Sequence, residues 1–83
     1  MDYQTKIKLI TEKLNNIKKE SFTLIKNDAY NTKVNFTYDS DTKGVQLNIT
    51  SDNLIFTETY KLSKDNIKRL AKAYQSQAYI LQN

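Results

Sequence analysis

Apolar side chains recur at steps of three and four along the first part of the chain. The set is Tyr3, Ile7, Ile10, Leu14 and Ile17. This spacing places all five on one face of a helix, with lysines and other polar residues on the remaining surface, Lys6 among them. The pattern predicts a helix over residues 3–19 whose apolar stripe packs on a core, since about two heptads are too few for a coiled coil.

After Ser21 the apolar positions alternate with polar ones, which is the period of a half-buried β-strand. Strands are expected over about 22–26, 34–38, 45–50 and 54–60; the first is the least constrained, because the connector after it fits several loop shapes. Gly44 is the only glycine and ends a polar segment, where a hairpin needs a left-handed residue. The last three strands should therefore form an antiparallel meander.

A second helix is expected to begin after Ser63, which is a good N-cap and is followed by Asp65 in the first turn. Its apolar stripe would be Ile67, Leu70, Ala71, Tyr74, Ala78 and Leu81. The fold class is thus α+β: a three- or four-stranded antiparallel sheet with an N-terminal and a C-terminal helix on one face. At this length, residues 1–83 make a single domain.

The composition removes several chemistries. The chain has no His and no Cys, so Ser-His and Cys-His nucleophiles and thiolate metal sites are impossible, and one glycine cannot build a phosphate-cradling loop. Residues 39–44 begin like a calcium loop, but Lys43 occupies a ligand position and Thr50 replaces the bidentate Glu. The sequence predicts no enzyme activity, no catalytic residue, no metal, no cofactor and no small-molecule substrate.

Localisation is expected to be cytoplasmic. No signal peptide is visible, no apolar stretch approaches the length of a membrane span, and a secreted domain of this size would usually need disulfides. The abundance of Lys, Asn, Ile and Tyr suggests an AT-rich genome, such as a low-GC Gram-positive bacterium or its phages.

Positive charge is concentrated at the end of the chain. Residues 61–83 carry five basic groups against Asp65 alone, whereas residues 21–60 carry a net charge of −2. On a continuous helix, one strip about 80° wide would hold Lys64, Lys68, Lys72, Gln75 and Tyr79, with Arg69 beside it. Lysines four residues apart repel by roughly 0.2–0.5 kcal/mol per pair. This face is either a solubilising surface or a contact for an anionic partner, and we expect the contact.

The order helix–strand–strand–strand–helix, with the basic segment 61–73, resembles the double-stranded RNA-binding domain. That resemblance implies that lysines at the start of the last helix grip phosphates across a groove. Asp65 interrupts the cluster here, and the family's Gly-Pro segment is absent. The layout and composition are also similar to small phage-encoded anti-CRISPR proteins. Many of those are acidic DNA mimics, so a basic one would have to bind guide RNA or an acidic protein patch.

The expected function is therefore that of a binding protein, an inhibitor or modulator of a nucleic-acid-handling complex, acting in the host cytoplasm if it is phage-encoded. Its partner would be a protein or ribonucleoprotein complex, and we expect no membrane contact. One alternative is a domain that binds double-stranded RNA or DNA directly through the same face. Another is an oligomeric structural protein, for example a homodimer, that buries the Tyr3–Ile17 stripe or an exposed strand edge between subunits.

Overall fold

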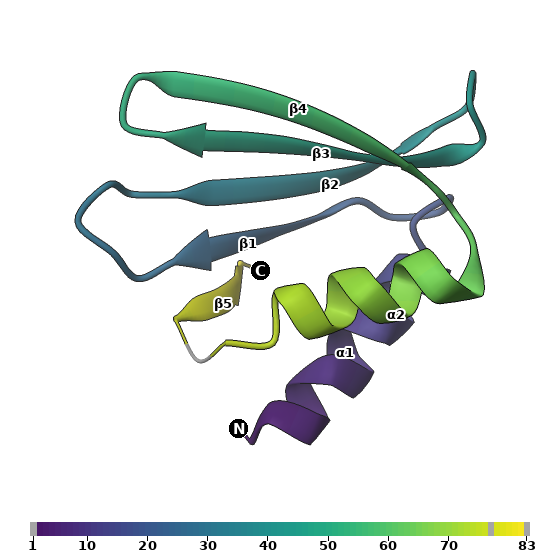
Figure 1. Cartoon of the computed structure of the whole chain (residues 1–83), viewed down its shortest axis with the longest axis horizontal. Coiled ribbons are helices and arrows are strands. Elements are labelled where there is room, and N and C mark those ends of the chain that lie inside the picture. The colour runs from purple at the N-terminus through teal and green to yellow at the C-terminus, as the bar shows by residue number, and fades with distance from the viewer. Residues whose placement is uncertain (1, 77, 83) are drawn as a thin grey trace.

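The computed structural model describes residues 2–76 and 78–82. Within them the chain forms, in order, α1 (Tyr3–Asn15), β1 (Phe22–Lys26), β2 (Lys33–Asp39), β3 (Gly44–Ser51), β4 (Leu54–Lys61), α2 (Lys64–Ala73) and β5 (Tyr79–Gln82). The strands make one antiparallel sheet in the order β4-β3-β2-β1-β5, and both helices lie on the same side of it (Figure 1). The α+β prediction is confirmed, but the sheet has five strands rather than three or four.

The core lies between the two helices and one face of the sheet. Alternate residues of β1, β2 and β3 point into it, as their period of two requires. At its centre Phe36 is fully buried, stacked on Phe22 with ring centroids 4.5 Å apart and met edge-on by Tyr74 at 5.4 Å. The buried apolar residues are Ile10, Leu14, Ile17, Phe22, Leu24, Val34, Phe36, Val45, Leu47, Ile67, Leu70 and Ala71.

The first helix is shorter than its apolar pattern predicts. Asp2 caps α1 by accepting a hydrogen bond from the Thr5 amide at 2.7 Å, and the helix ends at Asn15 rather than near residue 19. Ile17 still enters the core from the turn that follows. Tyr3, expected on the core stripe, is 56% exposed, because the first turn of α1 extends past the sheet.

The end of the chain is a strand where a helix was predicted. Helix α2 ends at Ala73, and β5 pairs antiparallel with β1, which sets Leu81 opposite Leu24 and Tyr79 opposite Lys26. The segment Tyr79-Ile80-Leu81 satisfies either a helical or an alternating pattern, and short apolar runs cannot be assigned by period alone. Pairing with the free edge of β1 decides the outcome, since it satisfies backbone groups of both strands. The 22–26 strand is confirmed.

The hairpin between β2 and β3 uses its glycine differently from the prediction. Gly44 does not have a positive φ; the left-handed residue is Lys43, with φ of 55°. The turn is organised by Asp39, whose carboxylate accepts hydrogen bonds from the Asp41 amide and the Thr42 hydroxyl, both at 3.0 Å. Glycine is needed at position 44 because a Cβ there would collide with the backbone carbonyl oxygen of Tyr60 on β4.

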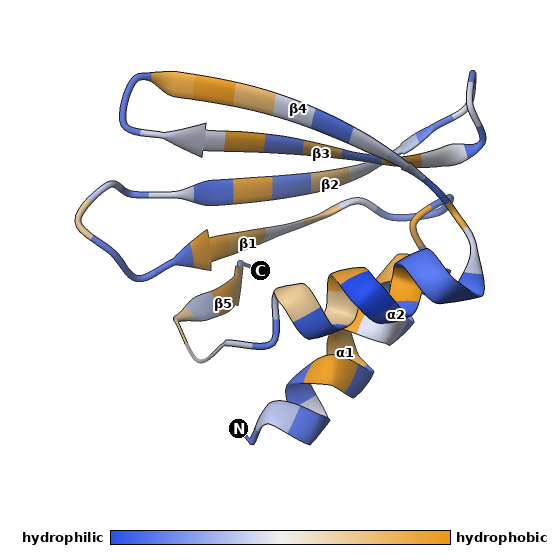
Figure 2. Cartoon of the chain, in the orientation of Figure 1, coloured by the Kyte–Doolittle hydropathy of each residue, from blue (hydrophilic) through white to orange (hydrophobic). Residues whose placement is uncertain are grey.

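Strand β4 is not half-buried as its alternating pattern predicts. Tyr60 packs against the core, but the first three residues of the strand, Leu54, Ile55 and Phe56, are 60%, 76% and 50% exposed. These residues form the apolar beginning of β4, at the edge of the sheet far from both helices (Figure 2). Leu54 and Phe56 face the helical side of the sheet, but this end of the outermost strand extends beyond the helical layer, so they find nothing to pack against.

Candidate functional site

The candidate site is the basic surface of α2. Ser63 caps the helix as predicted, because its hydroxyl accepts a hydrogen bond from the Asn66 amide at 3.1 Å. Ile67, Leu70 and Ala71 are buried and fix the orientation of the helix about its axis. This orientation turns the basic side chains to solvent. We call the exposed set Lys64, Lys68, Arg69 and Lys72 the α2 cationic face.

The α2 cationic face borders a groove between the two helices. Lys64 and Lys68 line one wall, and Ile7, Thr11 and Asn15 of α1 line the other, around a cavity of about 340 Å³. Thr11 is not free to bind a ligand as a donor, since its hydroxyl donates to the Ile7 carbonyl at 2.7 Å. The lysines therefore provide the positive charge at this groove, and Asp65 is the one acidic residue on α2. The arrangement can attract and hold an anionic group.

Gln75 and Tyr79 do not belong to this face, which corrects the prediction. Both lie beyond Ala73, where α2 ends, so the helical spacing that grouped them with the lysines does not apply. Gln75 is half-buried, and its Oε1 is buried without a hydrogen-bond partner among the described residues. Tyr79 lies on β5, where its ring meets Tyr74 edge-on at 5.0 Å and Lys26 lies 5.6 Å from its centroid. Its role is packing.

The packing of Tyr74 predicts a loss of stability in alkali. Burial, with smaller contributions from Tyr79, Glu58 and Tyr60, raises the pKa of Tyr74 from its ordinary value of 10.0 to about 12. The unfolded chain then loses this proton before the folded one does, so the free energy of unfolding should fall as pH rises from 10 to about 12. Because Tyr74 is only half-buried, solvent screening reduces the loss below the full value of the shift, to about 1–2 kcal/mol. Tyr74→Phe should retain that stability.

Urea unfolding at neutral pH and within this alkaline window, for wild type and Tyr74→Phe, measures the difference. Tyr60, whose pKa is also raised by its hydrogen bond to Glu58, contributes equally to both proteins and cancels. Equal pH dependence of the two proteins would contradict the prediction.

A second feature, Lys6 in an apolar cavity, was missed because Lys6 was expected at the surface. Only 8% of its surface is exposed, and its Nζ donates a hydrogen bond to the Ser76 carbonyl at 3.0 Å, which ties α1 to the segment after α2. Burial lowers the pKa of Lys6. The signal was present in the sequence: Lys6 precedes Ile10 and Leu14 at steps of four, on the same row of the helix.

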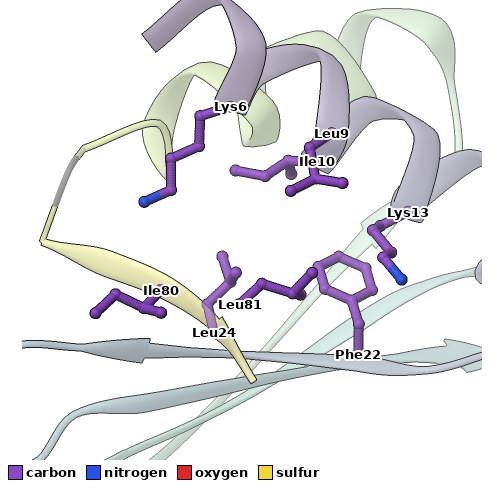
Figure 3. A pocket seen from close by; sticks show the side chains of 8 residues that line it. All are labelled: Lys6, Leu9, Ile10, Lys13, Phe22, Leu24, Ile80 and Leu81. Atoms are coloured by element: carbon purple, nitrogen blue, oxygen red, sulfur yellow. The ribbon is translucent and has the colours of Figure 1, made fainter. Parts of the chain in front are cut away.

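The cavity beside Lys6 has a volume of about 330 Å³ and lies between α1 and strands β1 and β5. Figure 3 shows Lys6 and Lys13 on opposite sides of a lining that is otherwise apolar. The lining residues are Lys6, Leu9, Ile10, Lys13, Phe22, Leu24, Ile80 and Leu81. Because both polar groups are cationic, the cavity is suited to an apolar group that carries negative charge, rather than to a neutral polar molecule.

Searches of known protein families, curated proteins and solved structures found no match to this chain. Neither α1 nor α2 is long and apolar enough to cross a membrane, and the described part contains no other helix to consider. Within residues 2–76 and 78–82, no three Asp or Glu side chains come together to hold a metal ion. The assignment of function therefore rests on the geometry of the chain itself.

Proposed function

We propose that this protein is a non-enzymatic binding protein whose α2 cationic face docks on an anionic surface of a nucleic-acid-handling complex. The observation that carries the proposal is the presentation of Lys64, Lys68, Arg69 and Lys72 to solvent on a helix of ten residues with one acid. Each lysine pair four residues apart costs folding stability. Lys64 also lies at the helix N-terminus, where the dipole disfavours cations. A face that opposes stability in this way is better explained by a partner than by folding.

The similarity in size and composition to anti-CRISPR proteins supports a mobile-element inhibitor as the particular role. The resemblance to the double-stranded RNA-binding domain is weaker in the structure than in the sequence. Its layout has three strands between the two helices, whereas this chain has four there, and β5 follows the last helix. Direct binding of nucleic acid through the α2 cationic face is the alternative function, and the same experiment separates the two.

The test compares two double variants that change the net charge equally. The first, Lys68→Glu with Lys72→Glu, reverses two charges of the α2 cationic face. The matched control, Lys8→Glu with Lys19→Glu, reverses the charges of two other exposed lysines, one on α1 and one in the segment that follows it. Tagged proteins are used to capture partners from the native host lysate after nuclease treatment. We expect wild type and the control to retain the same partner, and the α2 variant to lose it by at least about tenfold.

Mobility-shift assays with a short duplex RNA, a duplex DNA and a single strand complete the test. We expect the purified protein to bind none of them tightly at physiological salt. Tight binding whose affinity falls steeply with salt, and which the α2 variant loses, would assign the function to direct nucleic-acid recognition instead. If the α2 variant keeps the nuclease-resistant partner at wild-type affinity, the α2 cationic face is not the contact.

A further inference from the structure

The outer edge of β4 is a long sheet edge with few protective features. β4 is eight residues long and ends the sheet on one side, whereas β5, at the other edge, has four residues. An edge strand presents unpaired N–H and C=O groups, and proteins usually protect it with prolines, bulges or several charges. β4 has neither prolines nor bulges, since the chain contains no proline and the pairing with β3 is continuous from Leu54 to Lys61. Its charged residues are two, Glu58 and Lys61, and the first six positions of the strand contain only Glu58.

The backbone groups that β4 offers can be assigned from its hairpin. Ser51 and Leu54 pair directly across a two-residue turn, so they form a hydrogen-bonded pair with each other. Antiparallel pairs alternate, which leaves the N–H and C=O groups of Ile55, Thr57 and Thr59 directed outward. The side chains of these three residues also lie on the sheet face away from the helices, since their β3 partners are the polar residues between the core positions.

We propose that two copies of the chain pair antiparallel through β4, with Thr57 on the two-fold axis, to form one continuous ten-stranded sheet. An edge that pairs with an identical edge about a two-fold axis is necessarily antiparallel. Residues directly opposite each other must share a face of the sheet. With Thr57 on the axis, Ile55 lies opposite Thr59 of the second copy and Leu54 opposite its Tyr60. The exposed apolar beginning of β4 is then covered at both ends of the ladder.

Charge favours this register over the neighbouring register, in which Glu58 instead of Thr57 lies on the axis. Placing Glu58 on the axis would give the same overlap but would set the two Glu58 carboxylates directly opposite each other, which is destabilising. With Thr57 on the axis, Glu58 lies opposite Phe56, and Lys61 lies beside the turn that carries Asp52 of the second copy. The opposite charges at the two ends of β4 are thus complementary to each other in an antiparallel pair, and both contacts occur twice.

The absence of Cys from the natural sequence makes a crosslinking test unambiguous. In a hydrogen-bonded antiparallel pair the Cα atoms are about 5.5 Å apart, within the roughly 4.4–6.8 Å that a disulfide spans. Thr57→Cys should therefore give a covalent dimer on mild oxidation that a reductant reverses. Thr59→Cys is the matched control, because its two copies would be offset by four residues, roughly 13 Å along the strand, and should crosslink at least about tenfold less.

Sedimentation of the uncrosslinked proteins gives the second measurement. Wild type should show a concentration-dependent dimer, and Ile55→Lys, which places a charge on the exposed edge, should raise the dimer dissociation constant at least about tenfold while circular dichroism stays unchanged. A wild type that stays monomeric at millimolar concentration overturns the proposal. Equal crosslinking of Thr57→Cys and Thr59→Cys, or crosslinking through Glu58→Cys alone, overturns the register.

Discussion

Phe36→Ala should lower the free energy of unfolding by about 3–5 kcal/mol, the cost of deleting a large side chain from a close-packed core. Phe36 has no exposed surface, and its ring contacts both Phe22 and Tyr74, which come from different layers of the fold. A domain of 83 residues has a total stability of roughly 4–12 kcal/mol. The variant should therefore lose at least about a quarter of the total stability and unfold at a clearly lower temperature than wild type.

Phe56→Ala is the matched control, since it removes the same side chain from a site that is 50% exposed. It should change the free energy of unfolding of the monomer by less than about 1 kcal/mol. Chemical denaturation followed by circular dichroism measures both variants at low protein concentration, where a dimer through β4 would be dissociated. Similar losses in the two variants would mean that the core is not centred on Phe36.

The parts of the fold that the sequence predicts are those decided by local pattern. Alternation alone locates β2, β3 and β4, and the Ser63 cap locates the start of α2. The identity of β5 depends on a contact with β1 more than fifty residues away, so no local period could reveal it. The exposure of Leu54 and Phe56 is also non-local, because it depends on how far the helices extend across the sheet.

The same distinction applies to the candidate site. The α2 cationic face follows from helical spacing between Lys64 and Lys72, a range that lies inside the helix, and its four basic side chains are exposed. Gln75 and Tyr79 were grouped with them only by continuing that spacing past Ala73. Their exclusion shortens the face but leaves its charge unchanged, since neither residue is ionised at neutral pH.

The two proposed surfaces are compatible with each other. The apolar beginning of β4 and the start of α2 lie at opposite ends of an eight-residue strand, about 25 Å apart at strand spacing. In the antiparallel pair the turn of the second copy lies beside Lys61, just before α2, so the pairing would leave open to solvent the part of the α2 cationic face further along the helix, Lys68, Arg69 and Lys72. A dimer would present two such faces, and a partner with two anionic sites would bind it more tightly than it binds one copy, without any new contact.

Gly44→Ala should destabilise the protein by about 2–3 kcal/mol, because the added methyl group meets backbone rather than a movable side chain. A Cβ at position 44 collides with the Tyr60 carbonyl oxygen and lies 3.2 Å from the Thr42 Oγ1. To make room for the added methyl group, β3 and β4 must move apart at the end of their ladder where Gly44 pairs with Lys61. Lys43→Gly should have the opposite effect and stabilise by about 1 kcal/mol, since Lys43 holds a left-handed conformation that glycine adopts without strain.

Thermal and urea unfolding of the two single variants test this pair of expectations directly. If Gly44 served the turn by its φ, as its position in the sequence first indicates, Gly44→Ala would cost only the strain of a left-handed alanine, about 1 kcal/mol, and Lys43→Gly would gain nothing. Changes of opposite sign in the free energy of unfolding for the two variants, with the larger change for Gly44→Ala, are expected only if the close approach of β4 is what requires the glycine.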